Sequence, residues 1–470
     1  MKKILCVLLA VMMLALLASA CSGDSDNSGG ATPTPPAGGG STPDDVTPQA
    51  GTAKYTSDGK RIITIGTWYD EYYVSKHTSI FDNPRLSNPE IAQIELDNMR
   101  AIEEKYNIVL DYVNLTWEGI QESITTSIFA GAPDCDVYRV DLQFGIPAVL
   151  SNLAVSLEDM GLEGTDIFGP QEVLKYLNVN QPQNYLFAGS IVNSIPNYPL
   201  AFNMNLIREA NLENPQDLWD RGEWTWDKWR EYLSALTKDT TGDGAIDVYG
   251  WSGYWTNLLE NLLFSNGTTV ASGPNETLSS TASIEVLDLI YTIYNVERTA
   301  RPWDQSNWEI NNNLYADGRS GFWIGADWIF QEQGGADLPF EIGVVPWPVG
   351  PHGGKDTNYH GKTGGNWFFV PRGVDDPRLV YDVMFDWQNW YDYDRSLAED
   401  LEWSQNQYMT ERNFDYAFMM SKNTGFDIWN NLGLGDNFSM VPIMDGEKTA
   451  AQYAEETRQL VQDALNNYFG

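Results

Sequence analysis

The sequence predicts an α/β protein of two lobes, and three observations carry this prediction. Strand-like and helix-like segments alternate over residues 62–140, which is the pattern of parallel strands joined by right-handed crossovers. A second set of helix and strand patterns follows from about residue 197. The body of the chain, residues 61–470, is about 410 residues long, which is more than one ordinary hydrophobic core organises.

Three strands and two helices are expected in the first lobe. Runs of β-branched and apolar residues predict strands at 62–68, 108–113 and 136–140. Helical patterns cover 89–106 and 118–130, and a Gly-Ala-Pro turn ends the second. Ligands of open α/β sheets lie beyond the carboxyl ends of the strands, so the residues there are the first candidates for a site. They are Trp68, Tyr69, Asp70 and Asp141.

Two helices of the later chain are expected to pack against a core. Thr225 is placed to cap one of them, and Pro377 begins the other. Each helix has one apolar face, and these faces consist of Trp226, Trp229, Leu233 and Leu236 in the first and Val380, Val383, Met384 and Trp387 in the second. The tryptophans of these faces are therefore expected in the core and not at a ligand.

The first twenty residues have the pattern of a bacterial secretory signal. Two lysines precede an apolar run at 4–17, and small residues precede Cys21. The run is too short for a stable membrane span. Small residues before a cysteine resemble a lipobox, whose cysteine is acylated and becomes the new N-terminus, although Ala18 stands where that pattern has Leu. The alternative is ordinary cleavage near Ala20, with Cys21 incidental.

A segment rich in Gly, Ser, Pro, Thr and Asp follows at residues 22–54. It has almost no large apolar side chain, so it cannot bury enough surface to offset its ordering entropy. We expect a disordered tether. An acylated cysteine, a tether and a globular body would place the protein outside the cytoplasm, anchored to the bacterial cell membrane through lipid alone.

The charge balance excludes nucleic acid as a partner. The chain has 28 basic and 65 acidic residues, a net charge of −37. Removing residues 1–20 removes two lysines and no acid, which leaves 26 basic and 65 acidic residues and a net charge of −39. A surface with this much negative charge repels the phosphate backbone of nucleic acids.

The cysteines and aromatic residues add two expectations. Cys6 lies in the signal and Cys21 is the expected anchor, so Cys135 has no partner and no disulfide framework is expected. Cys135 is expected to be a buried apolar residue. The 18 Trp and 24 Tyr residues exceed what a core needs and indicate stacking surfaces.

A series of short motifs in fixed order resembles extracellular solute-binding protein family 1, the sugar-binding lipoproteins of ABC importers. The similarity covers nearly all of the body. Its parts are the opening strand ending at Trp68, the turn at 131–137, the strand at 199–205, and the segments at 223–227, 239–250, 317–321, 325–328 and 343–351. The second of these strands has Phe202 and Met204 where the family pattern has Tyr and Lys.

The resemblance implies a two-lobe periplasmic-binding-protein-like fold of type II, with hinge crossovers and a ligand cleft between the lobes. The chain would cross near 195–200, 363–369 and 396–402. The implied parts are a signal peptide at 1–20, Cys21 with the tether at 21–60, a first lobe at 61–196 plus 366–395, and a second lobe at 197–365 plus 396–470. The implied protein is a monomer that binds a carbohydrate, partners ABC permease subunits and catalyses no reaction.

A sugar presents hydroxyls at its edge and C–H groups on its faces, so its site needs carboxylates or amides together with flat aromatic rings. The candidates lie at strand ends and in polar loops rich in aromatic residues. From the first lobe they are Trp68, Tyr69 and Asp141, and from the second Trp251, Tyr254, Trp255, Asp327 and Trp328. Asn366 and Trp367 lie at an implied crossover beside two glycines, which would let the backbone approach a ligand closely.

The loop at 239–247 predicts a structural Ca²⁺ site. Its spacing resembles an EF-hand loop, with oxygen ligands at alternating positions and a glycine at the sixth. The expected ligands are Asp239, Thr241, Asp243, Asp247 and the carbonyl of Ala245. Thr241 replaces the usual Asp or Asn, and Gly250 replaces the usual bidentate Glu. The alternative is a polar Asp-Gly turn.

Two other functions stay open. A polysaccharide-degrading enzyme needs only two suitably spaced carboxylates, but the sequence has no GxSxG, HExxH or clustered histidines. A receptor for a polyamine or peptide could use the same fold. The sequence does not identify the sugar, although the many tryptophans favour an oligosaccharide.

Overall fold

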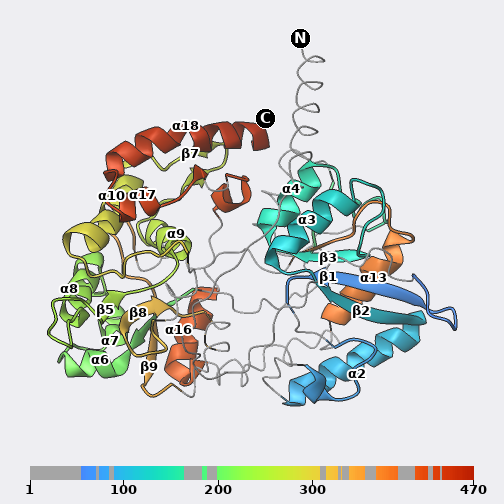
Figure 1. The fold of residues 1–470 in the computed structure, drawn as a ribbon, viewed down its shortest axis with the longest axis horizontal. Coiled ribbons are helices and arrows are strands. Elements are labelled where there is room, and N and C mark those ends of the chain that lie inside the picture. The colour runs from blue at the N-terminus through green and yellow to red at the C-terminus, as the bar shows by residue number, and fades with distance from the viewer. Residues whose placement is uncertain are drawn as a thin grey trace, which may run out of the picture. The chain divides into compact units, whose positions relative to one another are not determined.

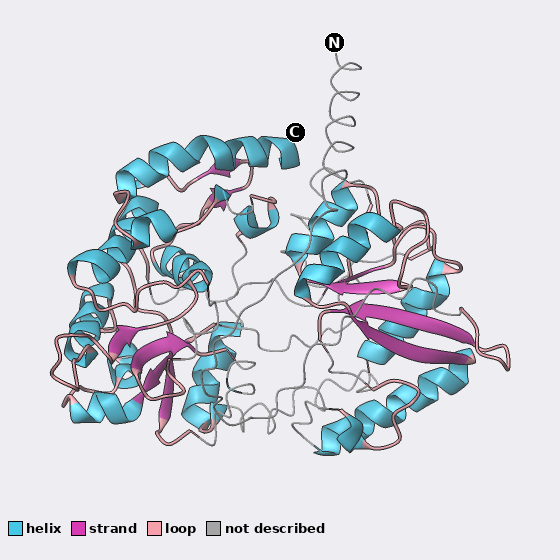
Figure 2. Cartoon of the chain, in the orientation of Figure 1, coloured by secondary structure: helices cyan, strands magenta, loops and turns pink. Residues whose placement is uncertain are grey.

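The computed structural model describes residues 54–69, 73–83, 89–162, 183–187, 198–306, 314–326, 330, 338–354, 367–389, 408–421, 427–434 and 437–469. These residues form two four-stranded sheets, each with its own helices, and one two-stranded hairpin (Figures 1 and 2). The predicted α/β class is confirmed. Among the described helices, none combines the length and apolar character that crossing a bilayer requires.

The first sheet has the strand order β10-β3-β1-β2. β1 (Arg61–Thr67) pairs in parallel with β2 (Ile108–Asn114) and β3 (Val137–Val140), and β10 (Trp367–Phe369) pairs antiparallel with β3. Ile63 of β1 is fully buried, as expected for a central strand covered on both faces. The three strands expected from the sequence are present, within one residue at each end.

Helices cover both faces of this sheet. Figure 1 shows α3 (Trp117–Ser127) and α4 (Leu142–Leu150) above the strands, α2 (Pro89–Tyr106) below them, and α13 (Pro377–Gln388), which contacts α2, crossing behind them. The short 3-10 helix η1 (Ile80–Asp82) precedes α2. The helix expected at 118–130 begins one residue earlier and ends three residues earlier, because a turn with Gly131 at φ 74° closes it.

The second sheet has the strand order β5-β8-β4-β9. β4 (Leu200–Asn203) pairs antiparallel with β8 (Ser320–Ile324) and with β9 (Ile342–Val345). β5 (Tyr249–Trp251) adds to β8 in parallel. Every residue of β4, β8 and β9 is buried, so this sheet forms the centre of its lobe.

Aromatic rings fill the space between this sheet and helix α8 (Trp226–Leu236). Thr225 caps α8 by accepting a hydrogen bond from the Lys228 backbone N–H, as expected from the sequence. The Trp229 ring centroid lies 6.0 Å from that of Trp251 and 6.1 Å from that of Trp347. The predicted packing role of the α8 tryptophans is confirmed.

The remaining elements follow β4 in the chain, and several of them pack on one another. Figure 1 shows the C-terminal helix α18 running alongside α10 and the hairpin strand β7. These elements are α6 (Met204–Glu209), α7 (Pro215–Asp220), α9 (Trp255–Ser265), β6 (Ala271–Ser272), β7 (Asn275–Glu276), α10 (Thr281–Tyr291), the π-helical turn η3 (Thr292–Val296), α16 (Glu411–Ser421), the 3-10 helix η5 (Ile428–Asn431), α17 (Val441–Met444) and α18 (Ala450–Phe469).

Candidate functional site

The carboxyl ends of the parallel strands in the first sheet meet at one edge. Thr67, which ends β1, pairs with Asn114, which ends β2. Val140, which ends β3, pairs with Trp367 at the start of β10. Ligands of open α/β sheets lie at such an edge, so it is the candidate site in this lobe.

Four aromatic rings gather at this edge. The ring centroid of Trp68 lies 5.2 Å from that of Tyr69 and 5.4 Å from that of Trp117. The Trp117 ring in turn lies 4.7 Å from Phe144 of α4. Trp68 and Tyr69 are half-buried, Phe144 is buried, and Trp117 keeps 40% of its surface exposed. The edge therefore offers aromatic surface held in place by a buried ring.

The helical pattern alone did not indicate Trp117, because the predicted helix begins one residue later, at 118. The signal was present, since Trp117 follows the end of β2 much as Trp68 follows β1. Its preceding residue, Thr116, has φ 62° and ψ 170°, a conformation that costs a β-branched residue about 1–3 kcal/mol. The Thr116 hydroxyl accepts a hydrogen bond from the Gly119 N–H, and the Thr116 N–H donates to Asn114 Oδ1. These bonds hold the strained turn.

Polar groups lie beside the rings. Asp141 caps α4, and its Oδ1 accepts hydrogen bonds from the backbone N–H and the side-chain amide of Gln143 at 3.0 and 3.3 Å. Its carboxylate retains lone pairs that can accept further hydroxyl protons. The Arg139 guanidinium lies 5.2 Å from the Tyr69 ring and 5.8 Å from the Phe368 ring. Arg139 was also missed, because a strand arginine in an acidic protein resembles a solvated residue.

The corresponding edge of the second sheet carries Tyr254 and Trp255, which follow β5. Tyr254 is half-buried and Trp255 is 6% exposed, with its ring centroid 6.2 Å from that of Trp429. Trp251 is fully buried because β5 places its ring between α8 and Trp347.

Burial also separates the candidates of the first sheet. Trp367 is 2% exposed, because β10 packs it into the core, whereas Trp68 and Tyr69 keep accessible surface. The structure therefore places Trp68, Tyr69 and Asp141 just beyond the ends of the neighbouring strands β1 and β3, and places Trp251, Trp255 and Trp367 among core residues. The contact of these three rings with a ligand stays a prediction. Asp327, Trp328, Asn366, Cys21 and the strand-end Asp70 lie outside the described residues.

The loop at 239–247 forms a network of hydrogen bonds between carboxylates and backbone amides. Asp239 accepts from the backbone N–H groups of Gly242 and Gly244 at 2.6 and 2.7 Å, and these bonds lower its pKa. Asp243 accepts from the Ala245 N–H, and Asp247 accepts from Thr240. Within the described ranges, no three acidic, His or Cys side chains converge as a metal site requires. The Ca²⁺ site, whose expected ligands include a hydroxyl and a backbone carbonyl, stays a prediction.

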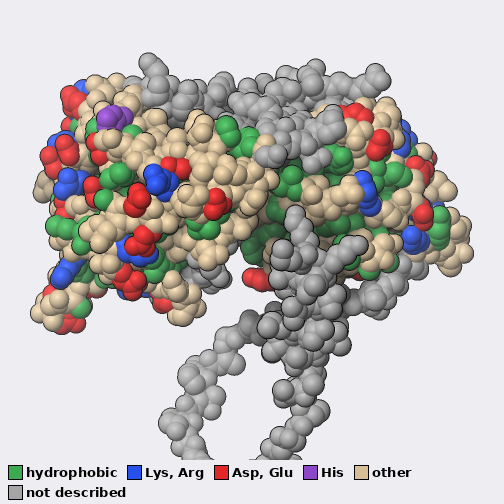
Figure 3. Space-filling model, turned by 90° about the horizontal axis from the view of Figure 1, so that it is seen from above, with side chains coloured by type: hydrophobic (Ala, Val, Ile, Leu, Met, Phe, Trp, Pro, Cys, Tyr) green, Lys and Arg blue, Asp and Glu red, His purple; other side chains and the backbone are tan. Residues whose placement is uncertain are grey.

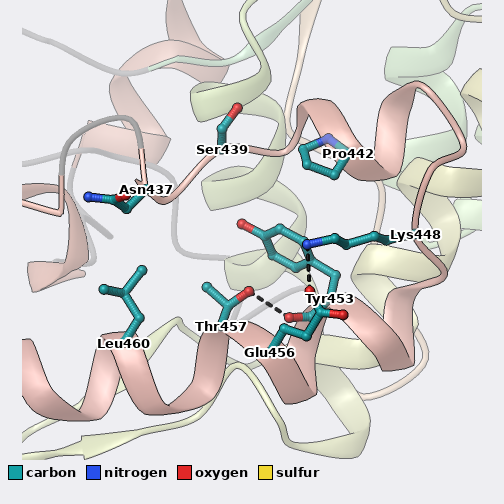
Figure 4. A pocket seen from close by; sticks show the side chains of 8 residues that line it. All are labelled: Asn437, Ser439, Pro442, Lys448, Tyr453, Glu456, Thr457 and Leu460. Carbon is teal, nitrogen blue, oxygen red and sulfur yellow. Dashed lines mark hydrogen bonds and ion pairs between the residues drawn. The ribbon is translucent and has the colours of Figure 1, made fainter.

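A small pocket of about 190 Å³ lies between α18 and the segment before it (Figure 4). Lys448 and Glu456 form an ion pair there, with Nζ and Oε2 2.5 Å apart. The Tyr453 hydroxyl is buried, and burial raises its pKa. None of the residues expected to bind ligand lines this pocket, so it is separate from the candidate site.

Acidic side chains are scattered over the face drawn in Figure 3, among basic and polar ones. Several acidic side chains of the described residues are paired with arginine, such as Glu213 with Arg221 at 2.8 Å. The negative charge is therefore spread over this face, and it does not by itself mark a binding site for a cation.

Comparison with known proteins relates this arrangement to one family. The family model of the bacterial extracellular solute-binding proteins matches residues 96–384, which is more than half of the chain. No curated protein matches the sequence.

Solved structures share the fold at low sequence identity. The substrate-binding protein Lmo0181 of Listeria monocytogenes, in complex with cycloalternan, is 14% identical with a TM-score of 0.64, over 87% of this chain and 99% of that one. UgpB of Mycobacterium tuberculosis, in complex with glycerophosphocholine, is 15% identical with a TM-score of 0.63, over 88% and 100%. The cyclic α-maltosyl-1,6-maltose binding protein of Arthrobacter globiformis is 16% identical with a TM-score of 0.58, over 87% and 100%. The predicted two-lobe fold of the type II binding proteins is thereby confirmed.

Proposed function

Because the chain belongs to the bacterial extracellular solute-binding proteins, we propose that it captures a sugar or oligosaccharide and delivers it to an ABC importer. The observation that carries this proposal is the grouping of Trp68, Tyr69, Trp117 and Asp141 at one sheet edge. Two proteins of similar fold support a glycan as the ligand class: one is in complex with cycloalternan, and the other is a cyclic α-maltosyl-1,6-maltose binding protein.

The chemistry of this edge suits a sugar. The exposed face of an indole can stack on the C–H face of a pyranose, and a ring is held there at little entropic cost because it has few rotatable bonds. The Asp141 carboxylate can accept hydroxyl protons, which would otherwise lose their hydrogen bonds to water at about 1–3 kcal/mol each. Ligand capture would shift an equilibrium between open and closed forms, and the closed form would dock on the permease.

We further propose that the chain is exported through its N-terminal signal, acylated on Cys21 and held at the membrane as a monomer by lipid and tether. The small residues before Cys21 and the Gly/Ser/Pro-rich segment after it support this proposal. Replacing Cys21 by Ser should move the protein from the membrane fraction to the soluble fraction. Mass spectrometry should find acyl chains on the wild-type N-terminal peptide alone, and an unmodified wild-type peptide would contradict the proposal.

The test of ligand class is intrinsic Trp fluorescence with a thermal-shift readout against monosaccharides, oligosaccharides, polyamines and short peptides. We expect a saturable change and a raised midpoint with one glycan class. Trp68→Ala should weaken that binding about tenfold, the value of one aromatic contact. Phe81→Ala, which removes a 77% exposed aromatic side chain from η1, should leave the affinity unchanged.

Other outcomes would assign another function. A response to polyamines or peptides alone would keep the receptor and overturn the sugar. Release of reducing ends from a glycan would indicate a polysaccharide-degrading enzyme, which is contrary to the proposal.

A further inference from the structure

Trp117 is a rigidly supported aromatic surface at the candidate site. It is the first residue of α3, so its backbone is fixed by the helix on one side and by the end of β2 on the other. Phe144, which is 8% exposed, lies against its ring at an interplanar angle of 63°. The indole therefore rests on the buried core and still keeps 40% of its surface open.

The turn that presents Trp117 is strained and held by side-chain bonds. Thr116 adopts a positive φ of 62°, where glycine would be free of strain. Its hydroxyl accepts from the Gly119 N–H at 3.2 Å, and its own N–H donates to Asn114 Oδ1 at 3.0 Å. Backbone strain of this kind persists where the surroundings fix one geometry, and it gathers at functional sites. Here the fixed geometry sets the direction of the Trp117 indole.

The neighbouring indole of Trp68 stands almost at a right angle to it. The two ring planes meet at 88°, with centroids 5.4 Å apart. A single sugar ring can stack its face on only one of these planes. A second ring of the same ligand meets the other plane only if it is turned sharply relative to the first. A flat β-1,4-linked chain, whose rings present parallel faces, cannot use both indoles, whereas a bent α-linked chain can.

We propose that Trp117 is a specificity-determining residue that, with Trp68, selects a bent oligosaccharide of two or more rings. This inference rests on the proposed function, since it assumes that the edge binds sugar. Within that function, the inference specifies the shape of the ligand and the residue that recognises this shape.

The test compares wild-type protein with Trp117→Ala by calorimetric titration. The probes are glucose, α-1,4-linked malto-oligosaccharides and β-1,4-linked cello-oligosaccharides of equal length. We expect the wild type to prefer the malto-oligosaccharides, and Trp117→Ala to weaken their binding about tenfold while changing glucose binding little. Phe129→Ala is the matched control, because it removes an 86% exposed aromatic ring just beyond the other end of α3.

Thr116→Gly provides a second variant that keeps the indole. It relieves the strained φ and removes the hydroxyl cap, so it should loosen Trp117 and weaken oligosaccharide binding more than glucose binding. Unchanged oligosaccharide affinity in Trp117→Ala, or wild-type binding of flat and bent chains alike, would overturn the inference while leaving the proposed function intact. Failure of every carbohydrate to bind the wild type would instead refute the proposed function, and the inference with it.

Discussion

Asp427 is a buried carboxyl group whose ionisation should control stability. It lies at the start of η5, where its Oδ2 accepts a hydrogen bond from the Val270 backbone N–H at 2.5 Å and its Oδ1 accepts from the Trp429 N–H at 3.4 Å. Burial raises the pKa of Asp427 to about 8, with a smaller rise from the charge of the buried Glu260, while the hydrogen bonds from backbone N–H groups act in the opposite direction. Replacing Asp427 by Asn keeps an oxygen for the Val270 N–H and removes the titration.

The magnitude follows from linkage. In the unfolded chain an Asp titrates near pH 3.9, so between about pH 4 and pH 8 unfolding releases a proton that the folded carboxyl group holds. The contribution of this group to stability is therefore full at low pH and is lost as the pH rises through the folded pKa. Between about pH 5 and pH 8 the loss is about 3–4 kcal/mol.

The assay is the free energy of unfolding in urea across this pH range, for wild type, Asp427→Asn and Asp227→Asn. All other titrating groups are shared, so the difference between wild type and Asp427→Asn isolates one carboxyl group. We expect Asp427→Asn to gain on the wild type as the pH rises. Asp227→Asn, whose side chain is 91% exposed, should run parallel to the wild type. Parallel curves for wild type and Asp427→Asn would refute the reasoning.

Three further predictions follow from packing and from the 239–247 loop. Gly250→Ala should lower the free energy of unfolding in urea by about 1–3 kcal/mol, because the added Cβ would lie 2.5 Å from the Leu233 carbonyl oxygen. An unchanged urea midpoint would show that α8 can shift freely. Cys135, 2% exposed and with its thiol pKa raised by burial, should resist alkylation until urea unfolds the chain, and peptide mapping that finds it labelled in folded protein would contradict its burial. Adding Ca²⁺ to metal-stripped protein should release or absorb heat in calorimetry and raise the thermal midpoint, and Asp239→Asn should abolish both effects. The absence of a calorimetric signal from the wild type would refute the calcium prediction.

The regular elements of the first lobe could be predicted because the apolar residues of each element follow a single simple pattern along the sequence. The Ile-rich β1 is covered on both faces, and α2 has its apolar residues on one side, so both were placed to within a residue. Thr225 was likewise identifiable as a cap, because a hydroxyl before an apolar helical face has few other uses.

The site was harder to predict, because a core aromatic and a stacking aromatic have the same local pattern. Trp68 directly follows β1 and Trp251 ends β5, yet Trp68 keeps accessible surface while Trp251 is enclosed by Trp229 and Trp347. The difference is made by residues that are distant in the sequence, since Trp347 lies nearly a hundred positions after Trp251. Trp117 was missed for the converse reason, since its role depends on a backbone conformation at Thr116 that the residue type itself disfavours.

The pairing of β10 with β3 has a consequence for the order of events during synthesis. β3 ends at Val140, and its partner begins at Trp367, more than two hundred residues later. At translation rates of about 5–20 residues per second, β3 waits on the order of 10–45 s for the strand that covers its edge. A nascent chain of this protein therefore cannot complete its first lobe until most of the second has been made. Until then β3 carries an unpaired edge, and such an edge can pair with a strand of another chain.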